Sequence, residues 1–288
     1  MLTSTEIDFY SKRFGEEKAV ETIAKAGFDA WDFSMFSMAH CNRDNMTLYY
    51  NENHPLGRPD YLAFARKLKK IGLDNGIFCN QSHAPFPSCE KRNLDILKRA
   101  IECTAEAGGK ICVIHPNNND SAEENAEMYN ELLPFAKSCD VRIATENMWN
   151  WNHDRNEASD AACSNPQSFV AHLDAVNDPY LVACLDIGHA EMKGLGTTAP
   201  EMILALGDRL QALHIHDNDK WHDFHMPPFT MKIDFVPIIA ALKKINYSGI
   251  FTLEASSCID NVSDIDVPEA VAALYSSVKR LADMFDAD

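Results

Sequence analysis

The sequence lacks the features that mark membrane, secreted and disulfide-rich proteins. No apolar run approaches the roughly 20 residues that span a bilayer, and residues 1–17 have neither the basic start nor the apolar core of a secretory signal. The nine cysteines stand singly, without a C-x-x-C pair. We therefore expect reduced thiols in a cytoplasmic protein, and neither a disulfide framework nor a cysteine-ligated zinc site.

Basic residues are also scarce. Lysine and arginine total 26 against 43 aspartates and glutamates, which leaves a formal net charge of −17 at pH 7. Nucleic-acid binding depends largely on neutralising phosphates, so we do not expect this chain to bind DNA or RNA. The sequence also contains no P-loop, G-x-S-x-G or H-E-x-x-H motif.

What the sequence does contain is a regular alternation of helix-like and strand-like segments. The seven helix-then-strand pairs are 15–27 and 28–35, 58–72 and 76–85, 89–109 and 110–116, 121–139 and 141–147, 165–176 and 181–189, 200–207 and 210–217, and 235–247 and 249–256. Asn165 as N-cap and Pro166 at the first helical position support the start of the fifth helix. A shorter first strand is expected near 7–10 and a final helix over 266–284.

This alternation predicts an α/β fold with a parallel sheet. About eight units in 288 residues, with no Pro/Gly/Ser-rich linker between them, fit a closed (β/α)₈ barrel in which residues 1–288 form a single domain. A doubly wound open sheet is the alternative. It would not bring side chains from so many consecutive strands to one point, whereas a barrel does so at its C-terminal rim.

Five of the expected strands end in residues that can bind a divalent metal, at His115, Glu146, Asp186, His216 and Glu254. The three carboxylates each follow apolar or small residues, and an unpaired carboxylate is costly to bury. The basic residues on these strands, at positions 110 and 142, stand at strand starts and therefore at the opposite rim. A divalent cation is thus a simpler partner for the carboxylates than a salt bridge to lysine or arginine.

Two histidines compete for the imidazole position of this site. Side chains alternate along a strand, so His214 and His216 share one face, with His216 nearer the rim. We assign His216 as the ligand and His214 as a packing or supporting residue. Three carboxylates and one imidazole form a hard site, for which we expect Mn²⁺, with Zn²⁺, Mg²⁺ and Co²⁺ as alternatives.

In their order after successive strands, the motifs SHAPF, HPN, EN, LDIGH, HIHDND, DFH and TLE resemble the xylose isomerase-like TIM-barrel superfamily. This group contains sugar isomerases and epimerases, inosose dehydratases and endonuclease IV-type apurinic-site nucleases. The resemblance covers most of the chain. It also implies a TIM barrel.

Resemblance to the sugar isomerases and epimerases implies one metal ion, held by Glu146, Asp186, His216 and Glu254. It also implies that Glu146 and Glu254 act as acid and base, moving a proton beside a carbonyl through an enediolate. For Trp149, packing on a neighbouring helix is the alternative to an aromatic wall over the sugar. The residues expected to contact the substrate are His83, His115, His189, Trp149, Asp223 and His225.

Resemblance to the nucleases implies a different site. There a three-zinc cluster is held by nine residues, and the matching positions here are all filled: His83, His115, Glu146, Asp186, His189, His216, Asp223, His225 and Glu254. Two departures from the sugar-acting relatives also stand out. PFTMKID replaces a glycine-containing loop after DFHMP, and Lys220-Trp221-His222 replaces an arginine of the tagatose-type epimerases.

We therefore predict a divalent-metal-dependent isomerase or epimerase of a small sugar or sugar phosphate, without nucleic-acid or membrane partners. The alternatives are an endonuclease IV-like zinc phosphodiesterase and an inosose-type dehydratase. The sequence leaves open the identity of the sugar, the need for phosphate and the oligomeric state, a homo-oligomer included.

Overall fold

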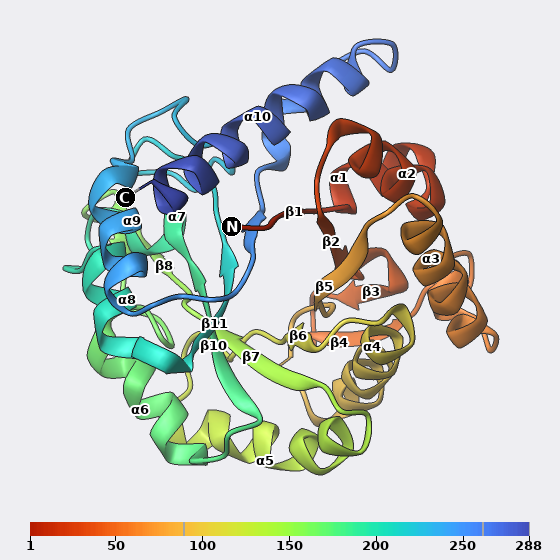
Figure 1. Cartoon of the computed structure of the whole chain (residues 1–288). Helices are drawn as coiled ribbons and strands as arrows, with labels where there is room; N and C mark the ends of the chain where they lie inside the picture. The colour runs from red at the N-terminus through yellow and green to blue at the C-terminus, as the bar shows by residue number, and fades with distance from the viewer. Residues whose placement is uncertain (89, 261, 288) are drawn as a thin grey trace.

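The computed structural model describes residues 1–88, 90–260 and 262–287. Eight parallel strands form one sheet in the order β11-β10-β7-β6-β5-β2-β1-β12. A parallel bridge between Ile215 and Leu253 joins the two edges and closes the sheet. The predicted barrel is therefore confirmed, and the helices surround its strands (Figure 1).

The barrel strands are β1 (Thr3–Glu6), β2 (Ala30–Ser34), β5 (Phe78–His83), β6 (Ile111–Val113), β7 (Arg142–Glu146), β10 (Leu181–Asp186), β11 (Leu210–His214) and β12 (Phe251–Leu253). The seven strands expected from residue 28 onward all lie within their predicted segments. Two short hairpins outside the barrel were not predicted: β3 (Ala39–Asn42) with β4 (Thr47–Tyr50), and β8 (Asn150–Asn152) with β9 (Glu157–Ser159).

The helices are α1 (Asp8–Phe14), α2 (Glu16–Ala26), α3 (Tyr61–Asp74), α4 (Leu94–Ala107), α5 (Ala122–Ser138), α6 (Pro166–Val176), α7 (Ile187–Ala190), α8 (Ala199–Leu206), α9 (Phe235–Lys244) and α10 (Val267–Asp286). Short 3₁₀ turns are η1 (Phe36–Met38), η2 (Pro55–Gly57), η3 (Lys91–Asn93), η4 (Gly207–Arg209) and η5 (Ser256–Cys258). The start of α6 is confirmed, since the Asn165 side chain accepts the Ser168 N–H. None of the helices in the described ranges is long and apolar enough to span a bilayer.

The first strand does not lie at residues 7–10, as the sequence analysis expected. It lies at Thr3–Glu6, and residues 8–14 form α1 instead. The segment Thr3–Glu6 contains no large apolar residue, although all four side chains are buried, so it gives no strand signal. The apolar residues Phe9 and Tyr10 that suggested a strand are buried on α1.

Alternation along the strands separates two apolar regions. Large side chains face outward toward the helices, as Trp31 and Phe33 do. The inward-facing apolar cluster is made of smaller residues: Val113, Ala144, Val182, Cys184 and Ala212. Two residues further along β7, β10 and β11, the inward face carries Glu146, Asp186 and His214. The packed interior therefore supports the candidate site from below.

Candidate functional site

Four potential metal ligands meet at the C-terminal end of the barrel. Glu146, Asp186 and His214 are the last residues of β7, β10 and β11, and Glu254 follows β12 directly. One ligand atom from each of the four lies within 4.8 Å of the others. His214 Nδ1 is 2.7 Å from a Glu146 oxygen and 3.5 Å from a Glu254 oxygen. The structure thus brings together the three carboxylates that the sequence analysis singled out.

Imidazoles surround these three carboxylates. Within the described part of the chain, every ion pair of Glu146, Asp186 and Glu254 is with a histidine. The alternative of salt bridges to lysine or arginine inside the barrel is therefore not found among these residues. Imidazole in its neutral form and carboxylate are both metal ligands, so the same groups are suited to hold a divalent cation.

In the structure the imidazole of this group is that of His214, whereas the sequence analysis assigned His216 as the ligand. The two side chains share a face, as expected, but the strand register pairs His214 with Asp186. His216 stands two residues, or about 6.6 Å, further along the chain direction. Its Nε2 approaches Asp186 Oδ1 at 3.0 Å from the outer side and faces Asp223 at 3.3 Å.

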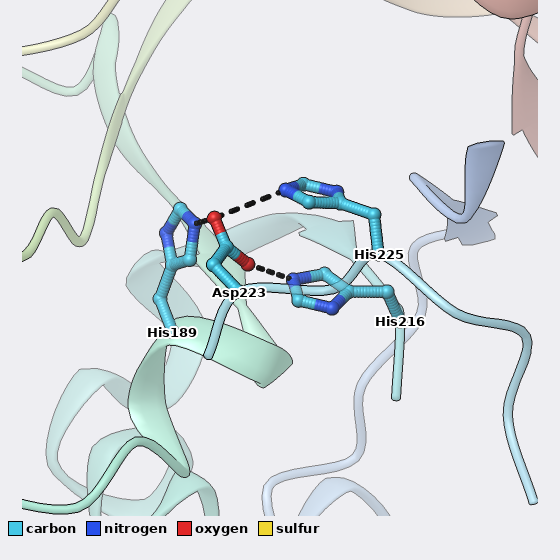
Figure 2. Close-up of side chains that lie close together, drawn as sticks. All are labelled: His189, His216, Asp223 and His225. Carbon is cyan, nitrogen blue, oxygen red and sulfur yellow. Dashed lines mark hydrogen bonds and ion pairs between the residues drawn. The ribbon is translucent and has the colours of Figure 1, made fainter. Parts of the chain in front are cut away.

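A second group of potential ligands lies beside the first. It consists of His189, His216, Asp223 and His225, and Figure 2 shows the Asp223 carboxylate between the three imidazole rings. One Asp223 oxygen is 3.1 Å from Nε2 of both His189 and His225. The rings of His216 and His225 stack with centroids 4.1 Å apart. Asp223 and His225 come from the irregular segment between β11 and α9. Their contacts with His189 and His216 hold this segment against the barrel.

His83 and His115 approach the other side of Glu146. Their Nε2 atoms lie 3.5 and 3.1 Å from Glu146 Oε2. Phe36 packs edge-on against His83, and Phe86 stacks on His115. These four rings form an aromatic and imidazole wall that reaches from the carboxylates to the mouth of the barrel.

The electrostatics of the site favour charged carboxylates. Burial alone would raise the pKa of Glu146, but the charge of His214, its hydrogen bond to Glu146 Oε1 and the nearby imidazole of His115 hold it well below 4.5. Burial would likewise raise the pKa of Asp186, but its imidazole neighbours lower it. Burial opposes charge on His214, yet surrounding anions, Glu146 and Glu254 among them, raise its pKa well above 6.5. The carboxylates therefore need positive charge beside them, from imidazolium groups or from a metal ion.

Several buried polar atoms of the site have no hydrogen-bond partner among the described residues. They are Glu146 Oε2, Asp186 Oδ2, His216 Nε2 and Asp223 Oδ1. Such atoms are costly in a protein interior, where nearly all polar groups are paired. A divalent cation would satisfy carboxylate oxygens and imidazole lone pairs at once, so the residues present fit a metal centre.

A cavity of about 680 Å³ lies over the Glu146 and Glu254 carboxylates. All six residues predicted to contact a substrate line it: His83, His115, His189, Trp149, Asp223 and His225. Four asparagines, Asn117, Asn118, Asn119 and Asn150, add amide groups to its wall. The cavity therefore offers both hydrogen-bonding groups and aromatic faces to a small polar ligand.

Three charged residues of the cavity were missed by the sequence analysis. Glu6, at the end of β1, and Asp8 and Lys12, on α1, line the side near Glu254. Lys12 forms an ion pair with Asp8, and Ser34 donates to Glu6 at 3.2 Å. They were missed because the strand that carries Glu6 was itself placed too late in the sequence. The sequence signal that could have found Glu6 is its place at the end of a strand, close to a second carboxylate, Asp8.

Glu6 gives a testable pH dependence. Burial, and then the negative charge of Glu254, raise the pKa of Glu6 from 4.5 to about 8. Because the folded-state pKa is the higher one, the stability due to this proton is complete below about pH 4.5 and is lost as the pH rises through about 8. With EDTA present, Glu6→Gln is expected to raise Tm over the wild type increasingly between about pH 5 and about pH 9. Thermal unfolding across this range measures it, and a Tm difference that does not change with pH would contradict the expectation.

Comparison with known proteins finds relatives over much of the chain. A family model described as xylose isomerase-like TIM barrel matches residues 20–286. The uncharacterized protein MJ1311 of Methanocaldococcus jannaschii is 22% identical over 267 residues, which cover 86% of this chain and 82% of that protein. An L-ribulose 3-epimerase of Methylomonas sp. is 35% identical over 88 residues only, 31% of this chain and 28% of that enzyme.

Solved structures of similar shape extend over nearly the whole chain. A D-tagatose 3-epimerase-like protein superposes with a TM-score of 0.72 at 19% identity and covers 99% of this chain and 98% of its own. A D-allulose 3-epimerase from Methylomonas sp., in complex with D-allulose, superposes with a TM-score of 0.69 at 16% identity, covering 98% and 97%. At these identities the similarity establishes the shared fold.

Proposed function

Because the chain belongs to the xylose isomerase-like TIM barrel family, we propose that it is a divalent-metal-dependent isomerase or epimerase of a small sugar. The observation that carries the proposal is the meeting of three carboxylates and one imidazole below a cavity lined by polar and aromatic side chains. The similarity in fold to sugar 3-epimerases supports the same class of reaction.

In this proposal Glu146, Asp186, His214 and Glu254 hold the metal ion. His214 replaces His216 as the imidazole ligand because it lies level with Asp186 in the sheet. A bound divalent ion would polarise the substrate carbonyl and make the neighbouring C–H more acidic. The oxygen-rich donor set favours Mn²⁺, with Mg²⁺, Co²⁺ and Zn²⁺ as alternatives.

Glu146 and Glu254 are proposed as the acid and base. They extend from β7 and β12 on either side of His214, and both line the cavity. One carboxylate takes the proton from the carbon beside the carbonyl. The other returns a proton, either to the neighbouring carbon, which gives an isomerase, or to the opposite face, which gives an epimerase.

The cavity favours a sugar without phosphate. Among the described residues that line it, Lys12 is the one lysine or arginine, and Asp8 already neutralises it. Phosphate recognition usually relies on free cationic side chains or helix N-termini. His189, which lines the cavity, is proposed to bind a substrate oxygen. Its Nδ1 is 2.9 Å from the Asn147 carbonyl oxygen and its Nε2 is 3.1 Å from Asp223, so the substrate oxygen would take the place of Asp223 at Nε2. Trp149 is proposed to cover the sugar from the loop after β7.

A second candidate function is a zinc phosphodiesterase. It is favoured by the two further groups of potential ligands, around Asp223 and around His83 and His115, which would allow more than one metal ion per chain. The net charge of −17 opposes binding of a polyanionic nucleic acid, which makes this the weaker proposal.

Metal analysis and isotope exchange separate these functions. The purified protein is assayed for bound metals and then incubated in D₂O with D-fructose, D-tagatose, D-allulose or L-ribulose, or with an inosose, and each reaction is monitored by NMR. Deuterium entering the carbon beside the carbonyl supports the isomerase or epimerase, whereas loss of water from a cyclic polyol ketone supports a dehydratase. Three tightly held zinc ions, hydrolysis of bis-p-nitrophenyl phosphate and no exchange in any sugar would replace the first proposal with the second.

A further inference from the structure

A network of polar side chains crosses the barrel interior one pleat below the proposed metal ligands. Ser4 Oγ donates to Asn80 at 2.7 Å, and Asn80 Nδ2 donates to Thr252 Oγ1 at 3.0 Å. Asn80 also donates to Gln81 Oε1 at 3.3 Å. Gln81 Nε2 in turn donates to Asp32 Oδ2 at 2.8 Å. These residues come from β1, β2, β5 and β12.

The polar character of this layer is unusual for a barrel. Interior layers of such barrels are dominated by branched apolar side chains. The opposite half of this interior, in β6, β7, β10 and β11, is also apolar, although its side chains are smaller. Asp32 and Thr252 are completely buried, and Gln81 is 2% exposed. Asp32 Oδ1 has no hydrogen-bond partner among the described residues. A buried carboxylate with so few partners destabilises the fold, which calls for a compensating role.

The network reaches the proposed metal site at His214. Nε2 of His214 lies 3.4 Å from Asp32 Oδ2, the oxygen that also accepts from Gln81. The other ring nitrogen, Nδ1, faces Glu146 and Glu254. A neutral imidazole carries a single N–H, so a proton on Nε2 leaves the Nδ1 lone pair free to bind a metal. When a carboxylate accepts the N–H of a ligating histidine, on the ring nitrogen that does not bind the metal, it fixes both the tautomer and the orientation of the ring.

We propose that Asp32 is a positioning residue that holds His214 in its Nε2–H tautomer and so directs Nδ1 toward the metal ion. This inference rests on the proposed metal site. Gln81 orients the Asp32 carboxylate, and Asn80 and Thr252 hold Gln81, so residues of three strands, β2, β5 and β12, contribute to the orientation of one ligand.

The test compares Mn²⁺ affinity in three variants, measured from the EPR signal of free Mn²⁺, with circular dichroism to verify folding. Asp32→Ala is expected to bind Mn²⁺ about 10- to 100-fold more weakly than the wild type. Asp32→Asn keeps an acceptor oxygen without the charge and is expected to lose less. Asp29→Ala is the matched control, because Asp29 bonds Thr3 just before the start of β2 and is expected to leave the affinity unchanged.

A second measurement uses the wild-type protein loaded with Zn²⁺, in which ¹⁵N NMR of the histidine rings reports the protonated nitrogen. A proton on Nε2 of His214 supports the inference, and one on Nδ1 overturns it. Equal Mn²⁺ affinity of Asp32→Ala and the wild type, within about threefold, overturns the inference alone and leaves the proposed function intact. A wild-type chain that binds no divalent metal removes both.

Discussion

Glu146→Gln and Glu254→Gln are each expected to reduce proton exchange at the carbon beside the substrate carbonyl by about 10³-fold or more. Glutamine keeps the size of the side chain but cannot take a proton, and both glutamates line the cavity next to His214. Both are also proposed metal ligands. The exchange is therefore measured by NMR in D₂O at Mn²⁺ concentrations at which metal analysis shows an occupied site.

Glu16→Gln provides a matched control for these variants. Glu16 is buried and lies 2.5 Å from the His54 imidazole, as the site glutamates lie beside imidazoles, but it is on α2 outside the barrel. This variant is expected to exchange protons at the wild-type rate. Turnover retained in Glu146→Gln or Glu254→Gln, with the metal bound, would remove that glutamate from the acid–base mechanism.

The carboxylates of the site could be predicted because their chemistry conflicts with their surroundings. Glu146 and Asp186 each end a strand directly after three or more apolar or small residues, and Glu254 directly follows a strand of such residues. A charged group in that position requires either a rim or a partner, and the barrel topology then places all three at the same rim. Local sequence and global fold agree here, so the inference needed no coordinates.

The imidazole of the site could not be chosen in the same way. Side-chain alternation places His214 and His216 on the same face, and sequence alone does not say where β11 sits relative to β10. The register, which pairs His214 with Asp186, depends on how every neighbouring strand packs. The sequence analysis assigned the histidine nearer the rim, whereas His214 lies at the depth where the three carboxylates meet in the structure.

Two other parts of the site lie in segments whose sequences show no hydrophobic periodicity. Asp223 and His225 lie in an irregular segment, and their contact with His189 follows from the path of that segment across the rim. Glu6 escaped notice because β1 consists of polar residues, and its inward-facing residue Ser4 meets a polar layer inside the barrel. Hydrophobic periodicity, the main sequence signal for a strand, is absent where the interior itself is polar.

Substitution of the two histidines separates their roles. His214→Ala is expected to weaken Mn²⁺ binding by more than about 100-fold, beyond the effect typical of a residue that only supports a ligand. Exchange activity falls with it, because the carbonyl is no longer polarised. The measurements are Mn²⁺ titration followed by EPR and the rise of Tm with added Mn²⁺, which reports binding to the folded state.

His216→Ala is the matched comparison, since both histidines are buried and stand on the same face of one strand. His216 Nε2 faces Asp223 and the outer side of Asp186, away from the Glu146 oxygens. The variant is therefore expected to retain Mn²⁺ binding within about tenfold of the wild type while loosening the segment that carries Asp223 and His225. The opposite result, with Mn²⁺ binding lost in His216→Ala and kept in His214→Ala, would show that His216 is the imidazole ligand. The end of the strand would then have to shift by two residues when the metal binds.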